Sequence, residues 1–262
     1  MPSISDYYTD EVYKHLRPLH ANWEPGKPVE LGHVGLIDDH KFEHKGNLLD
    51  IIKETGETVD LEVVKDDERD QKLFASEDAC KFKIYAKGGV DINGTVCANA
   101  GIDVEFTSQK GAFFNASECV HDMYANKIKI EKIILKLLEG GLWDKRWAIV
   151  TDIVHAGATT VIVSGGKKAS IKLEAGADIE QIDLADASIG LNISHMENVG
   201  YHEVTAVGMT PLIGLSKIKK RFLGPNELTP LMKRAPSMRS VSDIDDIEIG
   251  EDLESLYLAQ IE

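Results

Sequence analysis

Few side chains in this sequence have the spacing that metal binding or catalysis requires. His40 and His44 lie four residues apart among several acids, and on a helix this spacing would put two metal ligands on one face. Gly32, Gly35 and the acidic pair at 38–39 instead indicate a strand followed by a turn. We therefore expect a solvated loop here rather than a metal site.

The other combinations of reactive residues are weaker. The stretch SGGKKAS (164–170) lacks the first glycine of a phosphate-binding loop and falls between two expected strands. Cys119 precedes His121 where a strand is expected to pass into a helix. His195 and His202 lie seven residues apart with Glu197 and Glu203 nearby, and we expect no metal site there either. The sequence has no nucleophile-elbow serine and no paired-cysteine zinc spacing. We expect no enzyme activity, no cofactor and no metal.

Charge is distributed unevenly along the 262 residues, which carry a net charge of −15. Eight acidic residues and no basic residue lie between Val241 and Glu262. Just before them, the stretch 212–240 is strongly basic. The acidic balance disfavours a nucleic-acid partner. The juxtaposition instead predicts that an acidic tail interacts with a basic segment or with a partner.

The composition predicts an intracellular chain. The start of the sequence has no basic and apolar signal region, and no apolar run reaches the 18 residues of a membrane-spanning helix. The three cysteines, Cys80, Cys97 and Cys119, are an odd number, which is typical of free thiols in the cytosol.

The strongest periodic signal is that of β-strands. In VDINGTVCANAGIDVEF (90–106), apolar and polar residues alternate on both sides of a turn at Gly101. The segments 81–89 and 146–176 show the same alternation, with a turn in SGGKK. No proline occurs between Glu30 and Thr210, as expected for a continuous sheet. The apolar rows comprise Val90, Ile92, Val96, Ile102, Val104, Phe106, Val161, Val163, Ile171 and Leu173.

Two segments favour helices. Between 122 and 139, Ile130, Ile134 and Leu137 recur at helical spacing, and Gly140-Gly141 predicts the end of the helix. The stretch TPLIGLSKIKKRF (210–222) has a proline suited to a helix start. The expected fold is therefore α+β, with a twisted, mainly antiparallel sheet and flanking helices.

The order of these elements resembles the pore-forming domain of the gasdermin family. Two amphipathic strand pairs flank a helix that ends in Gly-Gly, and the strand AIVTDIV (148–154) then has a Thr-acid step. The resemblance covers roughly Lys81 to Leu223. Without a large repressor domain, the chain is similar to the short microbial and fungal members. Two features differ from the family pattern: Asp152 replaces the usual glutamate, and no cysteine for lipidation precedes Cys80.

The resemblance implies a function and a division of the chain. Residues 81–117 and 146–176 would be membrane-inserting hairpins, and basic side chains would bind acidic membrane lipids, namely Lys217, Lys219, Lys220 and Arg221. Residues 1–235 would form the pore-forming domain, and 236–262 an inhibitory tail. The chain would be cytoplasmic while inactive, and would form a homo-oligomer in the cell membrane once an activating protease has cut it, as a cell-death or defence effector.

The tail has its own pattern. Its last residues share one helical face and are expected to dock on the body as a short helix: Leu253, Leu256, Tyr257 and Ile261. The expected cleavage sites lie in the linker LMKRAPSMRS, after Lys233, Arg234 or Arg239, with a cut after Asp243 or Asp246 as a variant. Two alternatives stay open. One is a cytosolic β-rich binding module whose acidic tail recruits a partner, and the other is a hydrolase of an unrecognised kind.

Overall fold

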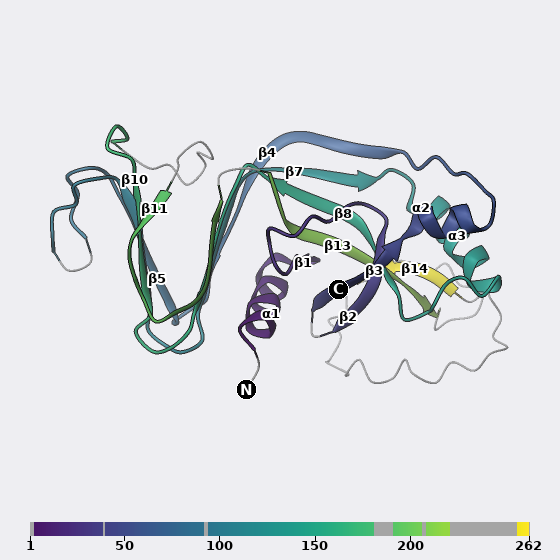
Figure 1. Cartoon of the computed structure of the whole chain (residues 1–262), viewed down its shortest axis with the longest axis horizontal. Helices are drawn as coiled ribbons and strands as arrows, with labels where there is room; N and C mark the ends of the chain where they lie inside the picture. The colour runs from purple at the N-terminus through teal and green to yellow at the C-terminus, as the bar shows by residue number, and fades with distance from the viewer. Residues whose placement is uncertain are drawn as a thin grey trace, which may run out of the picture.

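Antiparallel strands dominate the molecule. The computed structural model describes residues 3–38, 40–91, 94–180, 191–205, 208–220 and 256–261. In these residues the chain is a mixed α+β protein with two antiparallel sheets (Figure 1). The helices in this part of the chain are α1 (Ile4–Leu16), α2 (Leu48–Glu54) and α3 (Lys127–Glu139). The expected α+β, mainly antiparallel class is confirmed at this level.

The larger sheet has ten strands and forms the body of the protein. Its main order is β1-β13-β8-β7-β9-β12, while β14 pairs with β13, β2 pairs with β3 and β8, and β4 pairs with β7. The strands are β1 (Leu19–Ala21), β2 (His33–Asp38), β3 (Lys41–Asn47), β4 (Val63–Ala75), β7 (Ala112–Tyr124), β8 (Ala148–Ala156), β9 (Ala158–Ser164), β12 (Val199–Thr205), β13 (Met209–Lys220) and β14 (Leu256–Gln260).

The smaller sheet has four strands and lies at one end of the molecule (Figure 1). Its order is β11-β10-β6-β5. The strands are β5 (Cys80–Tyr85), β6 (Gly101–Phe106), β10 (Ser170–Ala175) and β11 (Leu191–Glu197).

The helix expected at 210–222 is wrong, because residues 209–220 form strand β13 in the middle of the large sheet. Leu212 and Ile213 are adjacent and both fully buried, so the strand is covered on both faces. A strand of this kind has no period-two alternation, and its apolar run cannot be distinguished from a buried helix by pattern alone. Pro211 lies where the ladder to β8 is irregular, between Met209 and Leu212.

Two alternating stretches were expected over 90–106, on either side of a turn at Gly101. The second is confirmed as β6, but among the described residues of the first, Val90 and Val96 form an isolated bridge and are largely exposed, so a strand there is wrong. The Asp91 carboxylate accepts a hydrogen bond from the Thr95 amide at 2.7 Å, which closes a turn, and Gly94 has a φ of 84°. This local turn replaces the ladder that an alternating pattern alone would predict.

Helix α3 has the expected buried face but a shorter span. The Asn126 side chain accepts a hydrogen bond from the Lys129 amide at 2.9 Å and caps the helix, while residues 122–124 belong to β7. Ile130, Ile134 and Leu137 are buried, as expected. They share a core with Ile149 and Ile218 of the large sheet.

We expect Ile134→Ala to lower the free energy of unfolding by about 2–5 kcal/mol, because it deletes buried methyl groups and leaves a cavity. The denaturation midpoint of the purified variant measures this effect. Ile128→Ala is the matched control, since the Ile128 side chain lies on the exposed face of the same helix. Equal midpoints for both variants would show that α3 does not pack as described.

Candidate functional site

The two sheets repeat one strand order. Across the small sheet the strand order is β5, β6, β10 and β11. In the large sheet, β4 pairs with β7, β7 with β9 and β9 with β12, so these four strands lie side by side in the corresponding order. Each small-sheet strand is joined directly in the chain to its counterpart, as β4 to β5, β6 to β7, β9 to β10 and β11 to β12. The small sheet is therefore one end of a four-stranded sheet that is folded back on the rest.

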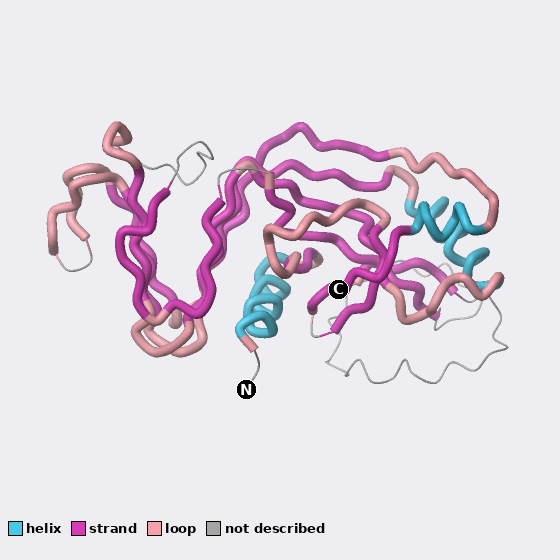
Figure 2. The backbone as a smooth tube through the Cα atoms, viewed as in Figure 1, coloured by secondary structure: helices cyan, strands magenta, loops and turns pink. Residues whose placement is uncertain are grey.

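Four short connections join the strands of the large sheet to those of the small sheet and reverse their direction. They are residues 76–79, 107–111 and 165–169 and the single residue Asn198. Figure 2 shows these loops gathered at one end of the small sheet, where all four strand pairs reverse. Adjacent connections are tied together, since the Thr107 amide donates to the Ala79 carbonyl at 3.0 Å and the Gly165 amide donates to the Asn198 carbonyl at 2.9 Å. We call these four connections the bends.

The small sheet is amphipathic. Its inner face packs against Phe113 and Ile162 of the large sheet. Rows of direct cross-strand partners carry apolar residues on that face, namely Phe82, Val104, Ile171 and Met196, and then Ile84, Ile102, Leu173 and Ile193. The alternate rows carry charged and polar residues on the outer face: Lys81, Glu105, Ser170 and Glu197, and then Lys83, Asp103, Lys172 and His195.

This arrangement places the sequence-predicted strand residues in two groups. Ile102, Val104, Phe106, Ile171 and Leu173 lie in the buried core between the two sheets. Val161 and Val163 lie on β9, on the face covered by α1. Val90 and Val96 lie outside the ladders, and Ile92 lies outside the described residues.

The second hairpin has different boundaries from those expected. The segment 146–176 was expected to be one hairpin, but β8 occupies the middle of the large sheet and has no small-sheet counterpart. The strands that fold back as a second pair are β9–β10 and β11–β12. The sequence predicts weaker strands near 190–207, and β11 and β12 lie there. The stretch LNISHMENVGYHEVT alternates around Asn198-Val199-Gly200, which is the pattern that indicates the pair.

Three of the bends hold a residue other than glycine in the left-handed region. These are Asp78, Lys168 and Asn198, with φ values of 58°, 61° and 52°. A Cβ atom makes this conformation unfavourable by roughly 1–2 kcal/mol, except for Asn and Asp, which tolerate it better. The folded-back form therefore carries backbone strain at Lys168 that an extended strand would not have.

We expect Lys168→Gly to stabilise the folded-back form and Lys168→Val to destabilise it, by roughly 0.5–2 kcal/mol in each direction. The Lys168 side chain is exposed, so both changes act through the backbone. Thermal midpoints and the hydrogen exchange rates of the small-sheet amides measure the effect. Identical exchange in the two variants would rule out strain at this bend.

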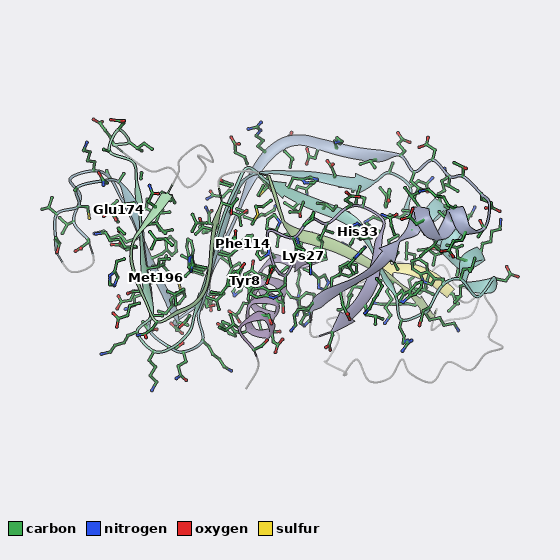
Figure 3. All side chains as sticks on the ribbon, viewed as in Figure 1. Tyr8, Lys27, His33, Phe114, Glu174 and Met196 are labelled. Atoms are coloured by element: carbon green, nitrogen blue, oxygen red, sulfur yellow. The ribbon has the colours of Figure 1, made fainter. Side chains whose placement is uncertain are left out.

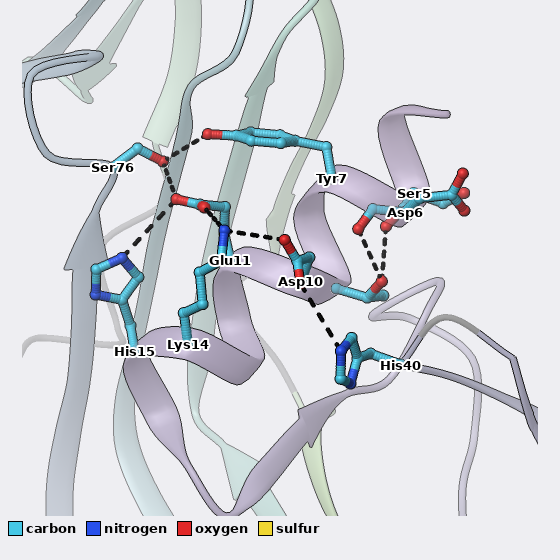
Figure 4. Close-up of polar contacts among 10 residues, drawn as sticks. Ser5, Asp6, Tyr7, Asp10, Glu11, Lys14, His15, His40 and Ser76 are labelled. Carbon is cyan, nitrogen blue, oxygen red and sulfur yellow. Dashed lines mark hydrogen bonds and ion pairs between the residues drawn. The ribbon is translucent and has the colours of Figure 1, made fainter. Parts of the chain in front are cut away.

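Helix α1 covers the face of the large sheet that lies opposite to the small sheet. Tyr8 and Val12 pack in one core with Phe114, Val161 and Val163. Tyr8 and Phe114 are labelled in Figure 3. Its Glu11 carboxylate accepts a 2.8 Å hydrogen bond from the hydroxyl of Ser76, a residue in the first bend (Figure 4). The same Ser76 oxygen lies 3.1 Å from the Tyr7 hydroxyl and accepts from the Ala112 amide at 3.0 Å. Helix α1 is thus bonded directly to the point where the sheet reverses.

A second contact holds α1 to the β2–β3 hairpin. Lys41 bonds the Asp6 carboxylate, and this bond is the largest cause that lowers the pKa of Asp6 to about 2. His40 stacks on the Tyr13 ring, with centroids 4.1 Å apart. The His40 Nε2 also lies 3.7 Å from an Asp10 carboxylate oxygen (Figure 4).

The C-terminal segment docks as a strand, so the expected short helix is wrong for residues 256–260. Strand β14 pairs antiparallel with Ser216–Lys220, and the Ile261 amide donates to the Leu215 carbonyl at 2.8 Å. Leu256 is buried against α3, and Glu131 of that helix accepts from the Leu258 amide at 3.2 Å. Tyr257 points to the opposite face of the strand from Leu256. Ile261 packs near Ile213 and Leu215. Leu253 lies outside the described residues.

The ladder partner of β14 is the strand that carries the basic residues. Lys219 pairs with Tyr257 and Lys217 with Ala259, so both lysines lie on β13 directly beside the tail. The backbone of Lys220 pairs with Leu256. Arg221 and the expected cleavage residues Lys233, Arg234 and Arg239 lie outside the described residues.

Chemistry-bearing clusters elsewhere are sparse. In the described ranges no group of three or more His, Cys, Asp or Glu side chains is placed to hold a metal ion. His33 and His44 face each other across the β2–β3 hairpin, with ring centroids 4.2 Å apart. The three cysteines are free thiols. Across the same residues, no helix is long and apolar enough to cross a bilayer.

Comparisons with known proteins do not identify the chain. No protein-family model matches the sequence, and no curated protein is significantly similar to it.

Proposed function

We propose that this chain is a latent membrane pore-forming protein of the gasdermin type. In this proposal the folded-back sheet opens at its bends, inserts into an acidic membrane and assembles with further copies of the chain. The C-terminal tail restrains the soluble form until a protease removes it. The protein is not an enzyme and needs no cofactor.

One observation carries the proposal, namely the shared strand order of the two sheets. Because each small-sheet strand continues a large-sheet strand, the four pairs become four long antiparallel strands if the bends straighten, with no change of neighbours. Strands β5, β6 and β10 have six residues each, which is shorter than the 9–11 residues that cross a bilayer. Continuity with β4, β7 and β9 supplies the missing length.

The faces of the small sheet support the same function. A membrane-inserted sheet needs one apolar face toward lipid and one polar face toward water. The inner face is apolar and is covered by the large sheet along β6 and β10, while Phe82, Ile193 and Met196 on the edge strands are partly exposed. The outer face carries charges of both signs. Opening the bends would therefore expose a lipid-compatible surface without breaking the pairing within the small sheet.

The tail supports a restrained form. Strand β14 occupies the edge of β13 beside Lys217 and Lys219, so its loss would uncover a basic strand. Each basic side chain near an acidic membrane contributes about 1 kcal/mol of attraction. Because the tail is tethered to the body, its effective concentration there is in the millimolar range, and cleavage of the tether removes that advantage.

Limited trypsin treatment tests this function. Purified chain is added to dye-loaded vesicles of acidic or neutral lipid, before and after clipping at the linker lysine and arginines. We expect leakage only after clipping and mainly from acidic vesicles, with strong salt dependence. A clipped chain that keeps its fold and causes no leakage on either lipid would instead favour the binding module whose tail recruits a partner.

A further inference from the structure

The place where the C-terminal strand docks has the features of a peptide-binding site. Strand β14 is five residues long and pairs antiparallel with residues 216–220 of β13. Further contacts to it come from helix α3. We call the surface formed by residues 216–220, helix α3 and the near end of β1 the slot.

The slot contacts both faces of the strand. Leu256 is 2% exposed and lies with Leu258 in the core that α3 covers. Ile261 packs instead against Ile213 and Leu215, in a different core. The two leucines and the isoleucine lie on opposite faces, because their positions differ by an odd number of residues. The slot therefore recognises the pattern Leu-x-Leu-x-x-Ile in an extended chain.

Both backbone edges of the strand are bonded as well. On the side of β13, the Ile261 amide donates to the Leu215 carbonyl at 2.8 Å. On the other side, the Glu131 carboxylate of α3 accepts a hydrogen bond from the Leu258 amide at 3.2 Å. The outer amides of an edge strand normally remain unpaired within the protein. Glu131 therefore gives the slot a contact that an ordinary open sheet edge does not offer.

Strand β1 closes one end of the slot. Gly214 of β13 pairs with Asp152 of β8 on one side and with Leu19 of β1 on the other. The ladder to β14 begins two residues further along β13, at Ser216. A strand in the slot cannot extend its ladder past Gly214, and a slip by one residue would turn its leucines to the wrong face. The slot thus favours a single register.

We propose that the slot is a binding site for an extended peptide supplied in trans, and that this peptide is the tail of another copy of the chain. Addition of a strand to a sheet edge is a common mode of peptide recognition, in which the ladder gives affinity and the side-chain contacts give specificity. The charges are complementary: residues 241–262 include eight acids and no base, while Lys217 and Lys219 lie on β13 in the slot.

Binding in trans changes how cleavage acts. Cleavage removes the tether but leaves the slot intact, so released tails and uncleaved copies compete for the slots of cleaved copies. Occupancy then depends on concentration, whereas a tethered tail binds at a fixed effective concentration. Because restraint by the tail is part of the proposed function, this consequence rests on that function, while the binding itself does not.

A labelled peptide of residues 253–262 tests the binding by fluorescence anisotropy, in solution and without membranes. The host is the full chain with Leu256→Asp and Leu258→Asp, in which the tail in cis is displaced. We expect binding at least about tenfold tighter than to the natural chain, whose own tail competes for the slot. Leu256→Ala weakens the tail in cis by a milder change, so its affinity should lie between the two, and it serves as the host if the double variant does not fold.

Matched changes test the individual contacts. A peptide with Leu258→Asp should bind at least about tenfold more weakly, because its carboxylate would enter an apolar core. Glu131→Ala in the host should weaken binding roughly tenfold, since the outer amide loses a charged acceptor. Lys132→Ala changes an exposed residue of the same helix and should have no effect. Equal binding of the two peptides, or no binding to any host, would overturn the proposal.

Leakage separates this binding from the proposed function. Excess peptide is added to the trypsin-cleaved chain on dye-loaded acidic vesicles, and we expect leakage to fall as the slot fills. Binding in solution together with suppressed leakage supports both proposals. Binding in solution without leakage from the cleaved chain, whether or not peptide is added, supports the slot and counts against the proposed function. Leakage that a saturating peptide does not suppress would overturn the restraint in trans.

Discussion

Replacing both Leu256 and Leu258 with aspartate will convert the uncleaved chain into one that leaks dye from acidic vesicles without any protease. Leu256 is buried against α3, and Leu258 lies on the same face of β14. Each leucine contributes about 1.5–3 kcal/mol when fully buried, and an unpaired carboxylate in its place opposes docking by several more. This exceeds what a short tethered strand can hold, so the tail should detach while the rest of the chain stays folded.

Dye release over time, measured beside the natural chain, checks this prediction. Leu256→Met is the control, because it keeps the volume and apolar character of the side chain, and that protein should stay silent until it is cleaved. Circular dichroism must show that the double aspartate variant retains its strands. A folded variant whose Ile261 amide exchanges freely and that still causes no leakage would contradict the role of the tail.

A single lysine on the inner face of β11 will abolish leakage by the cleaved chain. Ile193 shares its row with Leu173, Ile102 and Ile84, but its side chain is 43% exposed in the soluble form. Ile193→Lys should therefore barely change folding stability. In the inserted sheet the lysine faces lipid, where it costs about 2–4 kcal/mol per subunit at the bilayer midplane. Every subunit of an oligomer carries the same cost, so the loss should be nearly complete.

The neighbouring outer-face position gives the matched control. His195 is also exposed, and its ladder partner is Lys172, which lies on the charged face. His195→Lys should leave leakage after cleavage close to that of the natural chain. Equal leakage from the two lysine variants, with equal thermal midpoints, would show that the two faces of the small sheet do not have the roles assigned here.

The sequence predicts those elements well in which one face is polar and the other is apolar, because apolar residues then recur with the period of the helix or strand. Ile130, Ile134 and Leu137 recur at helical spacing because the opposite face of α3 meets water. Ile102, Val104 and Phe106 alternate because the outer face of β6 is polar. Both buried sets follow from local pattern, and both are confirmed.

Other elements could not be predicted because tertiary packing decides them. Leu212, Ile213 and Leu215 are covered on both sides, so β13 has no period of its own. The spacing of Leu253, Leu256, Tyr257 and Ile261 suits a helix face, yet residues 256–260 adopt a strand because the edge of β13 offers backbone partners. Such a choice depends on a surface that is distant in sequence.

The candidate site was visible only in part for the same reason. The alternation of 101–106 and 170–175 indicates two strands with apolar faces, but not that both belong to one sheet folded back on another. The matching strand order depends on pairings between residues far apart in the chain. The residues around the turn closed by Asp91 and Thr95 alternate in the same way, but they form only an isolated bridge and no ladder.

Removal of the tail alone should be enough to activate the chain, so the full chain is compared with one that lacks residues 241–262. Both are added at equal concentration to dye-loaded vesicles of acidic lipid. We expect the shortened chain to release most of the dye and to form large oligomers in the membrane, while the full chain does neither. A shortened chain that stays folded, monomeric and silent on these vesicles would contradict it.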